Sequence, residues 1–353
     1  MPDMLYVGLQ DDDQIAVFAF DDGSGQLTKR GDVAAVGGPS VMAIGPDRNT
    51  LYVGCRTRSS IASYRIDPAT GGLSLSGTAA QADAPTFLAP DRTGRYMLCA
   101  YYQGGYVAVY PIAADGAIGT AAVDKQETAV GAHAIATDPS NRFAFVPHIA
   151  RIQDNVLEPP KNNPGPNVIL QYRFDAQTGR LSPNRPQRVE QEDLVGPRHY
   201  IHHPSRDVVY FSNEQGCSVT AYRLDRANGT LSSAQTITTL PVGHSERTTC
   251  SQIHLAPTGR FLYVGNRAAN GSSIAAFAVD PATGHLTTAG HISTEAVPSA
   301  FCLDSAGHFL FAAGTASGRL ASYRIDQQSG ALTPLGVVEV GQRPAAVLAT
   351  RLG

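Results

Sequence analysis

Charged residues are scarce in this sequence, and neither sign is concentrated in any segment. Asp, Glu, Lys and Arg together make up 16% of the 353 residues, and the formal net charge is -3. Because no window gathers Lys and Arg into a basic stripe, the sequence excludes nucleic acid as an expected partner. An anionic small molecule would have to be bound by a few individually placed cations.

Long apolar segments are also missing. The first residues, MPDMLYVGLQDDD, contain neither a basic segment nor an apolar stretch of the length that directs export, and no later run could span a bilayer. We therefore expect a cytoplasmic protein without a membrane partner.

Motifs for metals, cofactors and covalent nucleophiles are absent as well. The chain has no Gly-x-Ser-x-Gly, no His-Glu-x-x-His and no phosphate-binding glycine loop. Its five scattered cysteines lack Cys-x-x-Cys spacing, so neither a disulfide framework nor a zinc site is expected. We expect no metal and no cofactor, and a reaction at this chain would use water as its nucleophile. The cysteines are Cys55, Cys99, Cys217, Cys250 and Cys302.

Turn-forming residues, in contrast, are abundant: 35 Gly and 23 Pro accompany 42% hydrophobic residues. This composition is typical of a globular protein that is rich in turns and poor in long helices. A chain of 353 residues usually divides into two or more domains, since single cores stop growing at about 250 to 300 residues. A ring of small sheets avoids this limit.

A short apolar segment, first present as Leu5-Tyr6-Val7-Gly8, occurs seven times along the chain. Successive copies are 45 to 53 residues apart, except for one interval of 65 residues between Phe145 and Tyr210. The long interval indicates an insertion at about residues 150–167, in the fourth repeat. The centres of the copies are Tyr6, Tyr52, Met97, Phe145, Tyr210, Tyr263 and Phe311.

A second apolar segment and a turn follow each copy. The turn has the pattern Asp, three residues, Gly, one residue and Leu, and it occurs six times, with a degenerate seventh version at Gly116 and Ile118. The Asp side chain can accept bonds from the backbone that follows it, and Gly tolerates the positive φ of the bend. A further apolar segment precedes each copy, so every repeat contains four short strands.

Seven repeats of four strands predict an all-β fold, a seven-bladed β-propeller that forms a single domain over residues 1–353. The chain begins with the second strand of a blade and ends, at residues 343–351, with a first strand that nothing follows. We expect this last strand to pair with Leu5 to Gly8 and close the ring. An open array or two sandwiches would leave Ala345 to Leu348 without a partner.

The repeats also provide an internal comparison for functional residues. The first strand of each blade lines the central channel of a propeller, and ligands commonly bind at one mouth of it. In our alignment, the residue after the Pro-like position of the first strand is small in five repeats and is His or Arg in the other two. The seven residues are Ser40, Ala84, His133, Arg198, Ser251, Ser299 and Ala345.

Polar residues also follow the second strand in blades four to six. Taken singly, each suits a solvated loop charge or a hydrogen-bonded histidine, but their concentration in three consecutive blades favours a shared site. Arginines bind carboxylate or phosphate, and Glu or His moves a proton. The predicted catalytic residues are His148, Arg198, Glu214 and Arg267, and the predicted substrate-binding residues are His133, His199, Asn213 and Asn266.

Two stretches resemble a known family, the propeller lactonases. The first stretch, Gly196 to Glu214, contains the family's segments GPRH, HP and NE in this order. The second, Ile253 to Arg267, contains the family's segments IH, GR and LY, with a proline before GR and an arginine after LY. The family is typified by bacterial 6-phosphogluconolactonase and includes the fungal-type 3-carboxy-cis,cis-muconate lactonising enzyme. The resemblance covers essentially the whole chain. It implies a site at His133, Arg198, Glu214 and Arg267, and His148 matches the catalytic histidine of the muconate enzymes by its position in the blade alone.

Three functions follow as hypotheses. The first is hydrolysis of a small anionic lactone derived from a sugar acid. Ser299 stands where bacterial phosphogluconolactonases have a further arginine, which favours an aldaric or uronic acid lactone over a phosphorylated one. The second is a carboxymuconate cycloisomerase with His148 as proton donor. The third is a non-catalytic binding propeller, although the Trp-Asp dipeptide of common scaffold propellers cannot occur in a chain without Trp.

The insertion at residues 151–167 has two interpretations. It is polar and rich in proline, so it can form a loop over the site that contributes Arg151 or Lys161. A plain surface loop fits its composition equally well.

Overall fold

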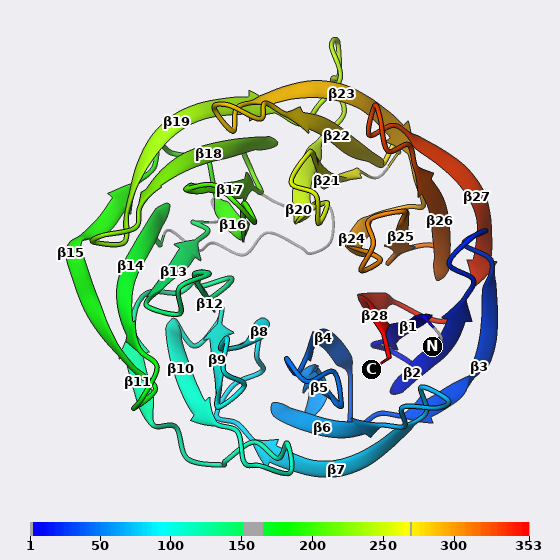
Figure 1. The fold of residues 1–353 in the computed structure, drawn as a ribbon, viewed down its shortest axis with the longest axis horizontal. Helices are drawn as coiled ribbons and strands as arrows, with labels where there is room; N and C mark the ends of the chain where they lie inside the picture. Colours follow the sequence, from blue (N-terminus) through cyan, green and yellow to red (C-terminus); the bar gives the residue numbers. More distant parts are fainter. Residues whose placement is uncertain (1–2, 151–164, 269, 353) are drawn as a thin grey trace.

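Short antiparallel strands form seven four-stranded sheets around a central channel in a computed structural model, which describes residues 3–150, 165–268 and 270–352 (Figure 1). Each sheet is one blade, and the blades are numbered here along the chain. The prediction of a seven-bladed all-β propeller is confirmed.

The strands of each blade run in chain order from the channel outward, except in blade one, where the last strand of the chain is innermost. Blade one contains β28 (Pro344–Arg351), β1 (Asp3–Leu9), β2 (Gln14–Phe20) and β3 (Leu27–Ala34). Blade two contains β4 (Pro39–Ile44), β5 (Thr50–Cys55), β6 (Ser60–Ile66) and β7 (Leu73–Ala80), with a 3-10 turn, η1 (Arg56–Arg58), after β5. Blade three contains β8 (Phe87–Pro90), β9 (Tyr96–Tyr101), β10 (Tyr106–Pro111) and β11 (Asp124–Glu127). Blade four contains β12 (Ala136–Thr137), β13 (Phe143–His148), β14 (Val168–Asp175) and β15 (Arg180–Glu190).

The last three blades follow the same plan. Blade five contains β16 (Pro197–His202), β17 (Val208–Asn213), β18 (Ser218–Asp225) and β19 (Thr230–Thr238). Blade six contains β20 (Thr248–Leu255), β21 (Phe261–Ala268), β22 (Ser273–Val279) and β23 (Leu286–Ser293). Blade seven contains β24 (Pro298–Leu303), β25 (Phe309–Gly314), β26 (Arg319–Ile325) and β27 (Leu332–Glu339).

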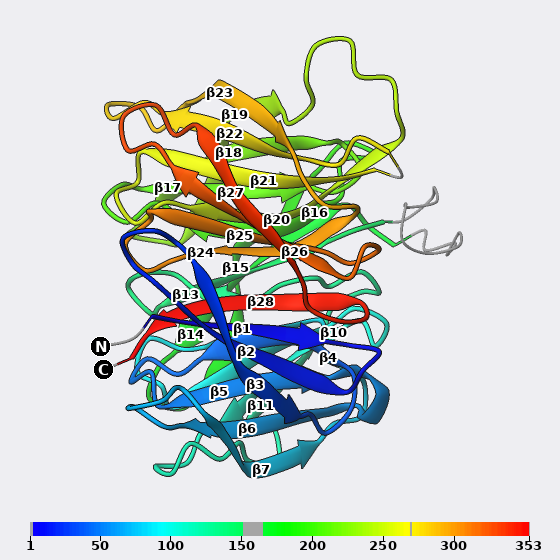
Figure 2. The ribbon, with the colours of Figure 1, turned by 90° about the vertical axis from the view of Figure 1, so that its right-hand side faces the viewer.

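The two ends of the chain close the ring. β28 pairs with β1 in antiparallel register, with Leu348 opposite Tyr6, and the two termini lie side by side (Figure 2). The Arg351 guanidinium donates to both carboxylate oxygens of Asp3, at 2.7 Å from Nη2 to Oδ2 and 3.1 Å from Nε to Oδ1. The predicted closure by the C-terminal strand is therefore observed, and it removes the inner edge that an unpaired β1 would expose.

The inner strands are buried on both faces because each blade is covered by its neighbours. Every residue of β1 and β5 is buried, whereas most of the outermost β3 is exposed. Neighbouring blades are also joined by a repeated polar contact. The hydroxyl groups of Tyr6, Tyr210 and Tyr263, each in the second strand of a blade, donate to the carbonyls of turn glycines in the next blade at 2.7 to 2.9 Å.

The turn with the Asp-Gly-Leu pattern forms as the sequence predicts. Oδ1 of Asp67 accepts the backbone N–H groups of Ala69 and Thr70 at 2.8 and 2.9 Å, and Gly71 has a φ of 73°. These bonds lower the pKa of the exposed Asp67 carboxyl. Gly71 also packs closely on the side chain of Met4 in blade one, so the position excludes a larger residue.

A β-bulge at the start of several first strands directs one residue toward the channel. In β16 the pairing register shifts between Pro197 and His199, which leaves Arg198 unpaired at the bulge. The same shift in β4 and β24 places Ser40 and Ser299 in the equivalent position. The bulge thus explains why this position faces the cavity in different blades.

One alignment position is corrected by the register of blade three. Phe87 pairs with Ala100 as Val41 pairs with Gly54 in blade two. The residue equivalent to Ser40 is therefore Thr86, two positions after Ala84. Pro85 and Thr86 of blade three thus correspond to Pro39 and Ser40 of blade two, and it is the pairing register that shows this.

The predicted insertion lies between β13, which ends at His148, and β14, which begins at Val168. Arg151 and Lys161 lie outside the described residues.

Candidate active site

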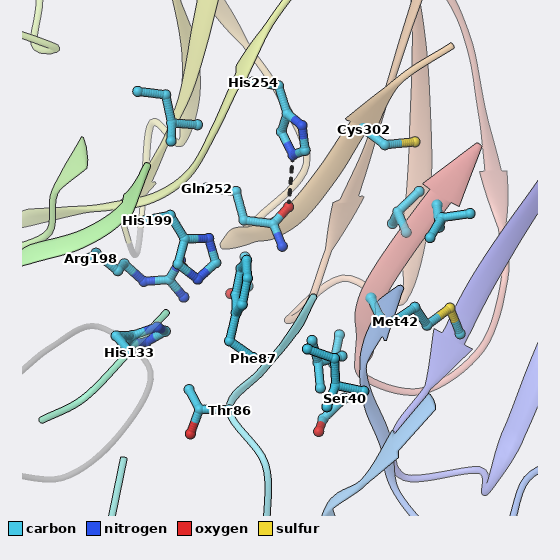
Figure 3. Close-up of a pocket in the computed structure, with 18 of the residues that line it drawn as sticks. Ser40, Met42, Thr86, Phe87, His133, Arg198, His199, Gln252, His254 and Cys302 are labelled. Carbon is cyan, nitrogen blue, oxygen red and sulfur yellow. Dashed lines mark hydrogen bonds between the residues drawn. The ribbon is translucent and has the colours of Figure 1, made fainter. Parts of the chain in front are cut away.

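A cavity of about 820 Å³ occupies the centre of the ring, a size typical of small-molecule sites. Residues from several blades line it: Arg198 lies at the bulge of β16, Glu214 directly follows β17, and Arg267 lies near the end of β21. The predicted residues that line this cavity are His133, Arg198, His199, Glu214 and Arg267. Figure 3 shows His133, Arg198 and His199 directed toward one another on one side of the cavity.

The Glu214 carboxylate is held by two arginines at the same oxygen. Nε of Arg198 donates to Oε2 at 2.9 Å, and Nη2 of Arg267 lies 2.8 Å from Oε2. The Glu214 side chain is 1% exposed, and both arginines are nearly as buried. At this depth the three charges interact far more strongly than they would at the surface, and the two guanidinium groups favour the ionised carboxylate.

Arg267 is fixed by a second bond but keeps one donor, Nε, that no described residue uses. Its Nη2 also donates to the carbonyl of Cys250 at 2.7 Å. Among the described residues, its buried Nε has no hydrogen-bond acceptor. A buried donor without an acceptor is costly, so this arginine is suited to bind an oxygen supplied by a ligand or by water.

His199 is a neutral base in contact with Arg198. Nη1 of Arg198 donates to Nε2 of His199 at 3.3 Å, which leaves the ring proton on Nδ1. Burial, with the neighbouring Arg198 charge, holds the pKa of His199 well below its usual value. The ring packs edge-on against Phe87 and His133, with centroids 5.0 Å apart in each case, which fixes its orientation (Figure 3).

A family model described as a seven-bladed β-propeller lactonase matches residues 4–349 of this chain. The chain belongs to this lactonase family. Its curated relatives include the 6-phosphogluconolactonases of Pectobacterium carotovorum, 36% identical over 73% of this chain and 72% of that protein, and of Serratia proteamaculans, 32% identical over 98% of both. Its solved relatives include a periplasmic gluconolactonase of Pseudomonas aeruginosa, 27% identical over the full length of both chains with a TM-score of 0.88. The assignment as an enzyme is confirmed.

Three predicted site residues of this lactonase do not line the cavity. The Asn213 amide donates to the hydroxyls of Ser218 and Thr220 at 2.9 Å, so it joins strands within blade five. The Asn266 amide donates to the Thr239 carbonyl at 2.7 Å, so it joins β21 of blade six to the segment that follows β19 in blade five.

His148, the third, is fully buried at the end of β13. Its Nδ1 donates to the carbonyl of Val146 at 3.0 Å, and burial lowers its pKa to about 4. The ring is therefore uncharged at neutral pH and directed into the blade. Strand alternation explains the two asparagines, because each lies one position before a cavity-facing residue, Glu214 or Arg267, and so points to the other side of the sheet.

The cavity of the lactonase also contains residues that the sequence comparison missed. Tyr102 follows β9 at the position that Glu214 holds after β17, and a comparison that included aromatic residues would have found it. Gln252 lies in a bulge of β20, which no sequence pattern indicates. Its Oε1 accepts from the Phe301 backbone at 3.0 Å and from Nε2 of His254 at 3.3 Å (Figure 3).

The part of the lactonase that the structure describes contains no group of three or more His, Cys, Asp or Glu side chains arranged to hold a metal ion. Within the same residues, no helix has the length and apolar character needed to cross a membrane. The expected cytoplasmic location stays a prediction, since one solved relative is named as periplasmic.

Proposed function

We propose that this chain hydrolyses the lactone of a sugar acid, with Glu214 as the general base, Arg267 as the group that stabilises the developing negative charge, and Arg198 as the group that positions Glu214. The observation that carries the proposal is the buried Glu214 carboxylate, which is held between two arginines at the wall of the central cavity. Such a group combines a proton acceptor with cationic donors at one point, as lactone hydrolysis requires.

The proposed reaction consumes one lactone and one water molecule. Glu214 takes a proton from water as the water oxygen attacks the lactone carbonyl carbon. Negative charge develops on the carbonyl oxygen, where the Arg267 guanidinium at the cavity wall stabilises it. The ring C–O bond then breaks, the leaving oxygen receives the proton from Glu214, and the product is the open-chain hydroxy acid.

Arg198 and the two histidines have positioning roles in this proposal. Arg198 fixes Glu214 through its Nε and orients His199 through its Nη1. His133 packs edge-on against His199 and lines the cavity, where its imidazole can bond the sugar hydroxyls. The neutral state of His199 avoids a third positive charge beside Arg198.

The relatives support a sugar-derived lactone as substrate. One relative named 6-phosphogluconolactonase matches 98% of this chain, and a solved relative is named gluconolactonase. The cycloisomerase alternative requires a proton donor at His148, which lies outside the cavity lining and is uncharged at neutral pH because burial lowers its pKa to about 4. The geometry therefore favours hydrolysis.

The test is a parallel assay of purified protein with 6-phosphogluconolactone, gluconolactone, glucarolactone, galactarolactone and carboxymuconate. A pH indicator follows acid release from the lactones, and ultraviolet absorbance follows carboxymuconate. We expect at least one lactone to be hydrolysed faster than it hydrolyses spontaneously, and Arg198→Ala to remove this activity. Turnover of carboxymuconate alone, or of no compound, would contradict the proposal.

A further inference from the structure

Gln252 is polar at a position of the innermost strands that is apolar in most blades. By the pairing register, Gln252 of blade six is the counterpart of His199 of blade five, and both line the cavity. The registers of blades one, two, three and seven also give the counterparts there. These are Ala346, Val41, Phe87 and Ala300. The fold therefore does not require a polar side chain at this position.

The bulge in β20 holds Gln252 in place. Ser251, the other residue of this bulge, is fully buried, and its hydroxyl bonds the carbonyl of Gly265 at 3.1 Å and that of Pro298, in blade seven, at 2.7 Å. Ser251 corresponds to Arg198 of blade five but does not line the cavity. In blade six, one residue of the bulge thus anchors the strand, and the next one faces the cavity.

Two hydrogen bonds fix the orientation of the Gln252 amide. Its Oε1 accepts the backbone N–H of Phe301 at 3.0 Å, and because a backbone N–H is only a donor, the amide oxygen must lie on this side. The same oxygen lies 3.3 Å from Nε2 of His254. Burial lowers the pKa of His254 to about 4, so the neutral ring carries one proton at pH 7, on the Nε2 that faces this oxygen. A flipped amide would lose both bonds.

The nitrogen of the same amide is directed into the cavity. Figure 3 shows Oε1 of Gln252 toward His254 and Nε2 on the opposite side. Nε2 donates to no residue in the described parts of the chain. A few polar groups of fixed direction determine how a ligand lies in a small-molecule site, and a group that is already ordered loses little entropy when it binds.

The strand that carries Gln252 also fixes the groups proposed for the reaction. Two residues before Gln252, the N–H of Cys250 donates to the carbonyl of Glu214 at 2.8 Å, and the carbonyl of Cys250 accepts from Nη2 of Arg267 at 2.7 Å. Two residues of a strand span about 7 Å, which is comparable with the extent of a sugar lactone. A substrate with its carbonyl at Arg267 can therefore present a hydroxyl group to Gln252.

We propose that Gln252 selects for hydroxylated lactones, with its Nε2 donating a hydrogen bond to one ring hydroxyl of the substrate. His254 is a positioning residue, because it acts through the orientation of the Gln252 amide. The inference rests on the proposed function, which places the lactone carbonyl at Arg267 and Glu214. A lactone without this hydroxyl leaves the amide donor without a partner and binds more weakly.

The test measures whether Gln252 and one hydroxyl group act together. It compares the sugar lactone that the unmodified protein hydrolyses best with analogues that each lack one ring hydroxyl. Gln252→Met removes the donor, and Gln252→Glu removes it but keeps an oxygen for the N–H of Phe301. We expect Gln252→Met to lower kcat/KM for the complete lactone about three- to tenfold, through KM. The matched control is Gln26→Met, at an exposed residue outside the cavity lining, which keeps the kcat/KM of the unmodified protein.

The analogues identify the hydroxyl. In the unmodified protein, we expect removal of one particular hydroxyl to lower kcat/KM by about the same factor as Gln252→Met does. In both Gln252 variants, removal of that hydroxyl then has no further effect. Each comparison is made within one variant and between lactones of equal charge, so the charge introduced by Gln252→Glu does not enter it.

His254 is tested through the same coupling. His254→Phe removes the donor to Oε1 and keeps an aromatic ring against Phe301, whose ring centroid lies 4.7 Å from that of His254. His254→Gln keeps an N–H donor. We expect His254→Phe to raise KM, to leave kcat nearly unchanged and to weaken the coupling between Gln252 and the hydroxyl, and His254→Gln to restore both. Unchanged coupling in His254→Phe would show that His254 does not position the amide.

The outcomes separate this inference from the proposed function. If the effects of Gln252→Met and of removing each hydroxyl simply multiply, Gln252 binds none of these hydroxyls, and the inference is overturned while the lactonase proposal stands. If the unmodified protein hydrolyses no lactone, the proposed function fails, and the role of Gln252, which depends on it, fails with it.

Discussion

The Nε of Arg198, at a bulge in β16, donates to Oε2 of Glu214, the residue that follows β17 in the same blade, at 2.9 Å. The bulge and the end of the strand are both needed for this contact, because regular pairing would turn the arginine into the sheet. Arg267 reaches the same oxygen from blade six at 2.8 Å. The site thus depends on the packing of two blades, and a change at Glu214 affects both.

The first prediction concerns Glu214 as the general base. Glu214→Gln keeps the shape of the side chain but removes the charge that accepts a proton, so we expect kcat to fall by about 10²- to 10⁴-fold. Steady-state hydrolysis of the preferred lactone measures this. Glu190→Gln is the control, because Glu190 is also paired with an arginine but is 66% exposed on β15, far from the cavity lining. Activity within about twofold of the unmodified protein in Glu214→Gln would exclude this role.

The same variant tests stability separately from catalysis. Removing the negative charge leaves two buried arginines close together, so we expect the free energy of unfolding to fall by several kcal/mol, about 3 to 5 for a broken buried pair. Urea unfolding and far-ultraviolet circular dichroism show whether the variant is folded at the assay temperature. A folded, inactive variant supports the catalytic role.

Most of the fold could be predicted because the pattern that defines a blade is local and repeated. Turn chemistry at Asp67 and Gly71 and the apolar second strands are visible in any single repeat. Ring closure followed from one further fact, that the last strand of the chain lacks a partner in its own repeat. The pairing of Tyr6 with Leu348 needed no information beyond this.

The candidate site was only partly predictable, because the direction of a side chain depends on bulges and strand alternation. Glu214 faces the cavity and Asn213, one residue earlier, faces the interior of its blade. The bulge that places Gln252 in the channel has no sequence pattern. Arg56 and Arg343 also line the cavity, but the sequence comparison singled out polar residues in blades four to six alone.

The second prediction is a loss of stability in mild acid. Burial lowers the pKa values of His148, His202 and His254 to about 4, whereas an unfolded histidine titrates near 6.5. Between these values the unfolded chain binds more protons than the folded one, so stability is full above about pH 6.5 and decreases as the pH falls toward 4. The slope is about 1.4 kcal/mol per pH unit for each proton taken up. Urea unfolding between pH 7.5 and 4.5 measures it.

A single histidine provides the check on this assignment. His202 packs between the rings of Phe145 and Tyr200, at 5.9 and 5.8 Å, so His202→Phe can fill the same space without titrating. We expect the slope of stability against pH in this variant to decrease by about 1.4 kcal/mol per pH unit, the contribution of one proton. The same slope in both proteins would show that His202 does not contribute.

The third prediction concerns the pair that joins the ends of the ring. Asp3→Asn removes the charge from a buried partner of Arg351, and Asp22→Asn removes the charge from an exposed partner of the same guanidinium, 3.1 Å away. The side chains of Asp3 and Asp22 are 5% and 70% exposed. We expect Asp3→Asn to lower the free energy of unfolding by about 1 kcal/mol and Asp22→Asn to have almost no effect, because exposed pairs contribute little. Equal effects in urea unfolding would mean that burial of Asp3 does not strengthen the closure.

The fourth prediction tests how the turn glycines hold neighbouring blades together. A Cβ at Gly229 in blade five would lie 2.0 Å from the ring of Phe143 in blade four, whereas nothing described lies within 4 Å of a Cβ at Gly243. Both glycines have a similar positive φ, 74° and 79°, so Gly243→Ala measures the backbone strain alone. We expect Gly229→Ala to cost about 1 to 3 kcal/mol more than Gly243→Ala in urea unfolding, because the side chain forces the two blades apart.

Phe143 provides the compensating change for this contact. It is buried at the start of β13, and its ring is the group that the new methyl would meet. Phe143→Leu alone leaves a cavity and lowers stability, whereas in the Gly229→Ala background the smaller side chain makes room for the methyl. We expect the double variant to be more stable than the sum of the two single costs, by about 0.5 kcal/mol or more. Strict additivity would show that the turn glycine is required for its backbone conformation and not for the packing of one blade on the next.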